Sequence, residues 1–254
     1  MSDAVLWHIP VSHFSEKARW ALDWKGIPWE SRAPTPGFHM AAAAWLTRGR
    51  GKTFPILQLD GRAIVDSSAI IAALEEHRPE PPLYPDDAAE RRRALELQDF
   101  FDAELGPQIR LLAFHELRRD REAMTGFAGE VMPDRVMRSE RGRAIASRMS
   151  ASFAQLRYRV AGEDAAAAAR EKVLAGLDRL DRELERSGGA YLAGDRFSVA
   201  DLTVASLFTP IVQPPEGPNH LELPQSLQEF RAPLRERPGF RWVLDTYARD
   251  RRPA

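Results

Sequence analysis

The N-terminal part of the chain alternates short apolar runs with an amphipathic segment. Residues 4–9 are apolar and end at Pro10, which predicts a buried strand because the run is too short for a helix. Residues 15–25 place apolar side chains at helical spacing before Gly26, a common helix stop. Residues 27–30 then begin a second extended segment. The pattern so far predicts strand, helix, strand.

A hairpin and a second helix follow. Residues 54–59 and 63–65 are rich in strand-forming residues, and Asp60-Gly61 between them is the strongest short signal for a tight turn. Residues 67–77 carry apolar side chains on one helical face. With a weaker helical pattern at residues 39–46, the predicted order is β-α-β-(α)-β-β-α.

Beyond a proline-rich stretch the pattern is helical. Residues 79–85 read PEPPLYP and cannot continue a helix. We therefore predict an α/β domain over residues 1–79, a linker over 80–87 and an all-α helical domain over 88–254. Helical patterns in the last domain cover residues 88–119, 135–160, 165–186, 198–208 and 240–249. Prolines between positions 210 and 218 predict an irregular loop, and Gly106-Pro107 predicts a break in the first helix.

Composition excludes several function classes. The 36 basic and 37 acidic residues give a formal net charge of -1, so no overall field recruits nucleic acid or acidic membranes. The chain has no cysteine, which excludes disulfide scaffolds and a protein thiolate. The early apolar run is too short for a signal peptide or a membrane span, so we expect a cytoplasmic protein. No pattern around its histidines suggests a metal.

Two short motifs suggest a binding site. Pro55 opens a strand without an N–H for the ladder, so it is either an ordinary trans proline at a strand start or a cis proline. A cis bond would offer the backbone of Phe54 to an extended peptide. Asp66 and Ser67 begin a helix, where they either cap it or grip the amino-acid end of a ligand. One ligand, a peptide with a free α-amino acid end, would satisfy both motifs.

This arrangement resembles the cytosolic glutathione transferases. Their glutathione-binding domain is thioredoxin-like, and the motifs quoted above match its cis-proline and its acidic-Ser helix start. The resemblance implies that Phe54 and Pro55 bind the cysteinyl part of glutathione, and that Asp66 and Ser67 bind its γ-glutamyl end. It extends to the helical half, because residues 197–201 (FSVAD) are similar to the family's structural capping box and staple.

The resemblance also implies a group that stabilises the glutathione thiolate. Cysteine-type members would need a cysteine, and tyrosine-type members need an early tyrosine, whereas the first tyrosine here is Tyr84. In serine-type members the activating hydroxyl falls at Ser12, with Ser15 as second choice. Ser12 could equally cap the helix that follows it. His13 could supply a donor near the sulfur or be a partly exposed turn histidine.

Further residues are candidates for binding glutathione and a second substrate. Lys52, or the nearby Arg48 or Arg50, could neutralise the glycyl carboxylate of glutathione, or the three could form a solvated basic loop. The electrophile pocket could be lined by aromatic residues of the helical half and the proline-rich loop, or these could be core. The aromatic candidates are Phe100, Phe101 and Phe114.

The resemblance implies a glutathione transferase that conjugates glutathione, its co-substrate, to an apolar electrophilic small molecule without a metal. It also implies a homodimer. Two alternatives stay open: a glutathione-dependent isomerase, and a non-catalytic binding or scaffold protein of the same fold. The segment 118–164 is longer than the fold requires, which favours the non-catalytic binding or scaffold protein.

Overall fold

The N-terminal half is a mixed four-stranded sheet with three helices, as the sequence predicts. The computed structural model describes residues 4–35, 38–158, 162–218 and 220–251. The strands and helices of this half are β1 (Ala4–Trp7), α1 (His13–Trp24), β2 (Trp29–Arg32), α2 (Phe38–Leu46), β3 (Ile56–Leu59), β4 (Arg62–Val65) and α3 (Ser67–His77). The strand order is β2-β1-β3-β4, with β1 and β2 parallel and the other pairs antiparallel.

Local turn chemistry explains these boundaries. Asp60 and Gly61 have φ of 50° and 74°, and positive φ at both positions is what a type I′ hairpin requires. The second strand begins at Trp29, later than predicted, because Ile27 takes part in the cap that follows the last residue of α1. The Ile27 N–H donates to the Leu22 carbonyl while Gly26, with φ 58°, donates to Asp23. This pair of bonds is a Schellman cap.

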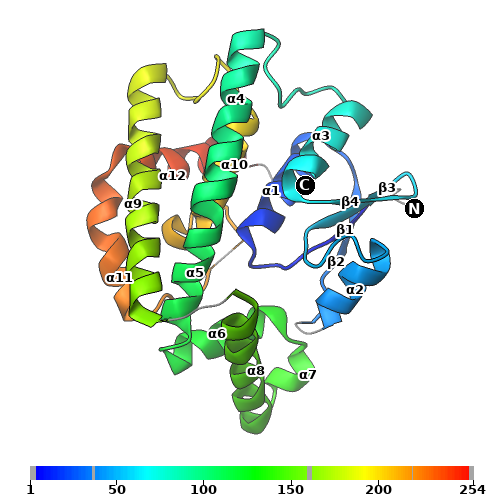
Figure 1. Ribbon diagram of the computed structural model, residues 1–254, viewed down its shortest axis with the longest axis vertical. Helices are drawn as coiled ribbons and strands as arrows, with labels where there is room; N and C mark the ends of the chain where they lie inside the picture. The colour runs from blue at the N-terminus through cyan, green and yellow to red at the C-terminus, as the bar shows by residue number, and fades with distance from the viewer. Residues whose placement is uncertain (1–3, 36–37, 159–161, 219, 252–254) are drawn as a thin grey trace.

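The second half is helical, which confirms the predicted class (Figure 1). Its elements are α4 (Ala88–Phe100), a π-helical turn (Phe101–Leu105), α5 (Gly106–Leu117), α6 (Arg121–Val131), α7 (Asp134–Met137), α8 (Glu140–Tyr158), α9 (Gly162–Ser187), α10 (Val199–Val212), α11 (Gln225–Arg231), a 3₁₀ turn (Ala232–Glu236) and α12 (Pro238–Asp250). In Figure 1 α6, α7 and α8 extend below the rest as a separate arm.

The arm differs from the predicted single helix at 135–160, whose last residues lie outside the described ones. The pattern is split between α7 and α8 near Ser139, whose hydroxyl accepts the Gly142 N–H at 3.0 Å. The sequence reading also missed α6. Asp120 begins that helix by accepting the N–H groups of Glu122 and Ala123 at 2.9 and 3.0 Å.

Pro210 does not begin a loop, so that part of the prediction is wrong. Helix α10 continues through it to Val212. Proline has no N–H to donate to the Ser206 carbonyl one turn earlier, and the Thr209 hydroxyl donates to that carbonyl instead at 2.8 Å. The proline therefore leaves no acceptor unpaired at this point of the helix.

The segment between α3 and α4 is fixed to both halves. Leu83 is buried, its N–H donates to the Glu75 carboxylate at 3.1 Å, and its carbonyl accepts the Val199 N–H at 2.7 Å. The buried Lys25 ammonium donates to the carbonyls of Pro79 and Pro81 at 2.9 and 2.8 Å. These hydrogen bonds hold the segment that connects the two halves in place.

Helix α1 lies between the halves and shares one continuous core with α10. The Trp20 ring contacts Phe197 and Tyr247, with ring centroids 5.3 and 4.5 Å away. The buried Glu16 carboxylate pairs with Arg19 and Arg251. Both the apolar and the charged side chains of α1 thus have partners in the helical half.

The sequence-predicted capping box begins α10. Ser198 accepts the Ala200 N–H, and the Asp201 carboxylate accepts the N–H of Ser198 at 2.9 Å. Asp201 also accepts the Leu192 N–H at 2.8 Å. Burial raises the pKa of Asp201 to about 6, although these hydrogen bonds oppose the rise. The carboxylate is therefore ionised at neutral pH and holds two segments together.

Replacing Asp201 by alanine should destabilise the protein by about 3 kcal/mol, because buried N–H groups lose a charged acceptor. Ser198→Ala, which removes only the cap hydroxyl, should cost about 1 kcal/mol. Urea unfolding measures both variants. Equal losses in the two variants would contradict this account of Asp201.

Candidate functional site

Ser12 lies where β1, α1 and the helical half meet. It is the N-cap of α1, and its hydroxyl accepts the Ser15 N–H at a long 3.4 Å. It is half-buried and lines an inner chamber of about 90 Å³ between the halves. Ser15 is fully buried, its hydroxyl accepts the Ile9 N–H at 3.2 Å, and it is not among the residues that line this chamber. Of the two serines, Ser12 is the one that faces the inner chamber.

The proline motif lies on the same chamber. The Phe54–Pro55 peptide bond is cis, the second of the two geometries that the sequence left open. Thr53 and Phe54 line the inner chamber together with Ser12. Ser12 and Phe54, which are 42 positions apart in the sequence, therefore line the same chamber.

Asp66 and Ser67 begin α3. Asp66 is exposed, and its Oδ1 accepts the N–H groups of Ser68 and Ala69 at 2.8 and 3.3 Å. Its φ of 80° is uncommon for any residue other than glycine, and such outliers gather at functional sites. Ser67 is buried as the first residue of the helix. Asp66 therefore caps the helix and also presents a carboxylate to solvent beside the helix N-terminus.

A buried lysine stands behind this helix start, and the sequence reading missed it. The Lys17 ammonium donates to the Ser68 hydroxyl at 2.8 Å and to Asp102 Oδ2 at 2.5 Å. Ser68 donates to the same Asp102 oxygen at 2.5 Å. Burial lowers the pKa of Lys17, and the negative charge of Asp102 opposes that shift. A lysine on the buried face of a predicted helix was the only signal in the sequence.

His13 is buried, contrary to the expectation of a partly exposed turn histidine. Its Nε2 lies 3.0 Å from the Gly106 carbonyl, and its ring packs on Phe14 with centroids 4.6 Å apart. Burial, reinforced by the nearby charge of Arg110, lowers the pKa of His13 to about 3. The imidazole is therefore neutral at pH 7, and the hydrogen bond assigns its proton to Nε2. His13 connects α1 to α5 and brings no charge to the chamber.

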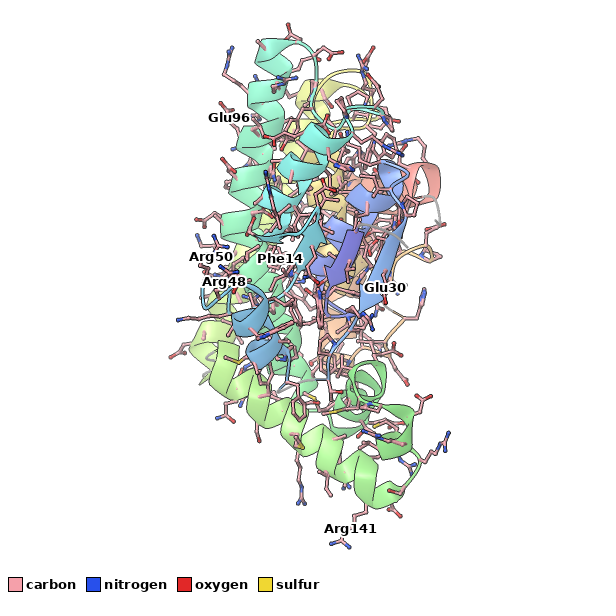
Figure 2. All side chains as sticks on the ribbon, turned by 90° about the vertical axis from the view of Figure 1, so that its right-hand side faces the viewer. Phe14, Glu30, Arg48, Arg50, Glu96 and Arg141 are labelled. Atoms are coloured by element: carbon pink, nitrogen blue, oxygen red, sulfur yellow. The ribbon has the colours of Figure 1, made fainter. Side chains whose placement is uncertain are left out.

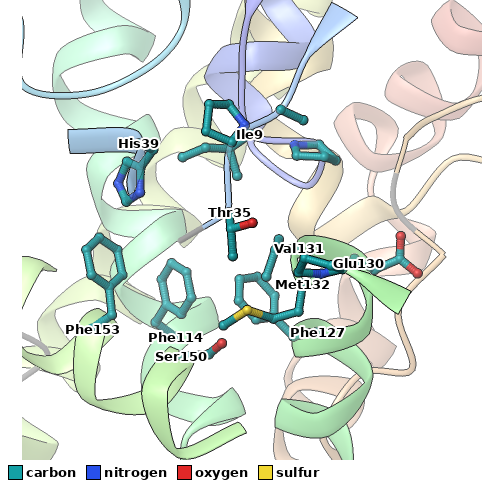
Figure 3. A pocket seen from close by; sticks show the side chains of 14 residues that line it. Ile9, Thr35, His39, Phe114, Phe127, Glu130, Val131, Met132, Ser150 and Phe153 are labelled. Carbon is teal, nitrogen blue, oxygen red and sulfur yellow. The ribbon is translucent and has the colours of Figure 1, made fainter. Parts of the chain in front are cut away.

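An outer chamber of about 230 Å³ adjoins the inner one. Ile9, Phe114 and Phe127 line both chambers. Figure 3 shows the outer chamber with Ile9, Thr35 and His39 on one side and side chains of α5, α6 and α8 on the other. The two chambers together form a largely apolar cleft between the N-terminal half and the helical half, with the arm on the side of the outer chamber.

Some of the residues that the sequence suggested as walls of an electrophile pocket line this cleft. Phe114 lines both chambers and Pro210 lines the inner one. Phe101 is fully buried in the core, and Phe100 packs edge-on against it with centroids 5.2 Å apart. Phe101 is core, because the π-helical turn directs it toward α9 and α10. Phe100, the last residue of α4, is half-buried and lines a separate pocket against α9, so neither residue lines the cleft.

The basic residues before the proline motif lie in an exposed loop. Arg48, Arg50 and Lys52 are exposed, and Figure 2 shows Arg48 and Arg50 at the surface of the molecule. The Arg50 Nε donates to the Thr47 carbonyl at 3.2 Å. Lys52 directly precedes the chamber residue Thr53. Its place fits either the glycyl end of a ligand or a solvated loop.

Metal sites and membrane-spanning helices can be assessed only for the part of the chain that the structure describes. No group of three or more histidine and acidic side chains there could hold a metal ion. No described helix is both long and apolar enough to cross a membrane.

Comparisons with known proteins agree with the fold. Residues 6–82 match the family description "Glutathione S-transferase, N-terminal domain" and residues 163–234 match "Glutathione S-transferase, C-terminal domain". The chain is 25% identical to the maleylacetoacetate isomerase of Dictyostelium discoideum over 201 residues. This aligned region covers 78% of this chain and 74% of that protein.

Solved structures share the fold. A theta class glutathione S-transferase from Xanthomonas axonopodis pv. citri, solved with glutathione bound, is similar with a TM-score of 0.57 and 22% identity, over 96% of this chain and 98% of that one. A maleyl pyruvate isomerase, described as a bacterial glutathione S-transferase of the zeta class, also has a TM-score of 0.57 and 22% identity. The match covers 97% of this chain and 99% of that one.

The buried neutral state of His13 should make stability depend on pH. Its pKa is lower folded (about 3) than unfolded (6.5), so the unfolded state binds more protons between these values. The contribution of His13 to the free energy of unfolding should therefore be at its maximum above about pH 6.5 and should decrease as the pH is lowered. His13→Gln should reduce that slope by up to about 1.4 kcal/mol per pH unit, measured by urea unfolding from neutral to mildly acidic pH. Identical slopes would show that His13 is not buried and neutral.

Proposed function

Because the chain belongs to the glutathione S-transferase superfamily, we propose that it transfers the glutathione thiolate to an electrophilic carbon of an apolar small molecule. The observation that carries the proposal is the inner chamber, where Ser12 and Phe54 face apolar residues of the helical half. A chamber with these two walls suits a reaction in which the enzyme mainly holds two reactants together.

Glutathione would lie along the N-terminal wall of the cleft. In this proposal the backbone of Phe54, beside Pro55, pairs with the cysteinyl part. The exposed carboxylate of Asp66 holds the γ-glutamyl ammonium, while Ser67 and the N-terminus of α3 hold its carboxylate. Lys52 neutralises the glycyl carboxylate. The buried charge of Lys17, near Asp66, adds to the field that favours an anion at this helix start.

Ser12 would keep the sulfur ionised. A thiol with a pKa of about 8.5 is mostly protonated at neutral pH, and a hydroxyl donor at a helix N-terminus favours the thiolate. Among the described residues the Ser12 hydroxyl makes only one long hydrogen bond, in which it accepts the Ser15 N–H, so its own proton can turn toward a sulfur. The thiol proton leaves to solvent, the thiolate forms a C–S bond, and the displaced electron pair leaves with a leaving group or moves into a conjugated carbonyl.

The isomerase alternative uses the same thiolate. Glutathione would add to a double bond, allow rotation and then leave, so no conjugate would accumulate. The similarity to the Dictyostelium maleylacetoacetate isomerase favours it, as does Arg110, a cation on the inner chamber wall that suits an acidic substrate. Analysis of the product separates the two reactions, because only the transferase product retains glutathione.

The remaining expectations follow from the family. We propose that the protein acts as a cytoplasmic homodimer with glutathione and an apolar electrophile as its partners. A non-catalytic protein of this fold is the third possibility. Failure of millimolar glutathione to raise the melting temperature would favour it over both enzymes.

Two substitutions at Ser12 separate activation from helix capping. Ser12→Gly keeps most of the capping preference but has no hydroxyl, so the pKa of bound glutathione should rise toward about 8.5 and kcat/KM should fall by roughly 10- to 100-fold. Ser12→Thr should retain most activity. The pKa is measured from thiolate absorbance against pH. An unchanged thiol pKa in the glycine variant, with glutathione still bound, would remove Ser12 from the mechanism.

The role of Asp66 can be tested without disturbing the helix. Asn caps helices as well as Asp and tolerates positive φ, so Asp66→Asn should leave the melting temperature unchanged while weakening glutathione binding about tenfold. Asp87→Asn is the matched control, because Asp87 caps α4 through the same two kinds of bond. Calorimetric titration measures binding. Equal affinities in the two variants would contradict a role for the Asp66 charge.

A further inference from the structure

The outer chamber is built largely by a part of the chain that neither family description covers. The matched stretches end at residue 82 and resume at residue 163, and α6 and α8 lie between them. These two helices supply Phe127, Ser150 and Phe153 to the chamber. The arm therefore shapes the cleft from outside the two stretches that the family descriptions match.

The size and lining of the outer chamber fit an aromatic ring. An apolar protein cavity of about 150 Å³ is enough to bind benzene. The outer chamber has a volume of about 230 Å³, whereas the inner one has about 90 Å³, so only the outer chamber reaches that size by itself. Three phenylalanines line it: Phe114, Phe127 and Phe153. Aromatic side chains favour edge and offset contacts with a further ring.

Ser150 is a buried polar group in this apolar wall. The residue is only 3% exposed, and its hydroxyl oxygen has no hydrogen-bond partner among the described residues. Figure 3 shows it at the base of the chamber beside Phe114. A serine hydroxyl within a helix commonly donates a hydrogen bond to the carbonyl one turn earlier. A buried hydroxyl without a hydrogen-bond partner lowers the stability of the fold. A ligand atom in the chamber would satisfy it.

We propose that the outer chamber binds the distal aromatic ring of an extended two-ring electrophile, and that Ser150 hydrogen-bonds an oxygen substituent on that ring. The proposal rests on the proposed function for its reacting end. The electrophilic carbon lies in the inner chamber near Ser12, and the molecule passes Ile9, Phe114 and Phe127, the walls that both chambers share. Ser150 is then a specificity-determining residue far from the sulfur.

Two matched enones test the size requirement. trans-Chalcone has an aryl ring on its carbonyl, whereas benzylideneacetone has a methyl group there and the same reacting carbon. In both, the thiolate forms a C–S bond at the β-carbon, the double-bond electrons move to the carbonyl, and the α-carbon takes a proton from water. The KM for chalcone should be at least about tenfold lower, because the second ring is buried. Equal KM values would overturn the proposal.

Substitution of Ser150 tests the hydroxyl. Ser150→Ala should raise the KM for a chalcone hydroxylated on its distal ring by about fivefold and leave that for unsubstituted chalcone within about twofold. The matched control is Ser147→Ala, a buried serine of the same helix that does not line the chamber. It should change neither value. Equal effects of the two variants on both chalcones would overturn the role of Ser150.

A non-reactive ligand separates this proposal from the proposed function. Dihydrochalcone has no conjugated double bond, so calorimetric titration measures its binding without turnover. Binding at least about tenfold tighter than that of benzylacetone, its one-ring counterpart, would support the chamber even if no enone were conjugated. Turnover of both enones with equal affinity for the two saturated ketones would overturn the chamber while leaving the transferase proposal intact.

Discussion

The burial of α1 between the sheet and α10 is the interaction on which the rest of the structure depends. Trp20 fills the core between Phe197 and Tyr247. The charged residues of α1 are buried as well, so each needs a partner, as Lys17 has in Asp102. A buried charge without its partner is strongly destabilising, which ties the position of α1 to both halves of the chain.

The same helix sets the geometry of the site. Its N-terminus carries Ser12 into the cleft, and His13 and Phe14 rest on α5 at Gly106. A side chain at Gly106 would place its Cβ 2.4 Å from the tip of the Phe14 ring, so any larger residue would displace that ring. The two walls of the inner chamber are thereby held at a fixed spacing, which is what the proposed reaction requires, because it is driven by positioning.

Local signals in the sequence predicted much of the fold. Asp60-Gly61 predicted the hairpin, residues 67–77 the helix α3, and Ser198 with Asp201 the capping box, because each depends on neighbours within a few positions. The chance of a cis bond at Pro55 was also readable from its place at a strand start. Boundaries such as that of β2 were less accurate, because a cap bond to the preceding helix decided them.

Long-range contacts could not be predicted. The pair of Lys17 and Asp102 joins residues 85 positions apart, and the burial of His13 depends on a carbonyl 93 positions away. The outer chamber needs walls from both halves and from an arm whose first helix the sequence reading missed. The candidate glutathione residues were therefore readable in advance, whereas the buried supports behind them and the arm chamber were not.

A crystal structure with glutathione tests the central claim most directly. We expect the glutathione sulfur to lie within hydrogen-bond reach of the Ser12 hydroxyl, the cysteinyl backbone to lie beside Phe54 and the γ-glutamyl end to lie at Asp66. A sulfur that faces Ser15, His13 or backbone alone would contradict the assignment of Ser12, and glutathione bound away from both Phe54 and Asp66 would contradict the site as a whole.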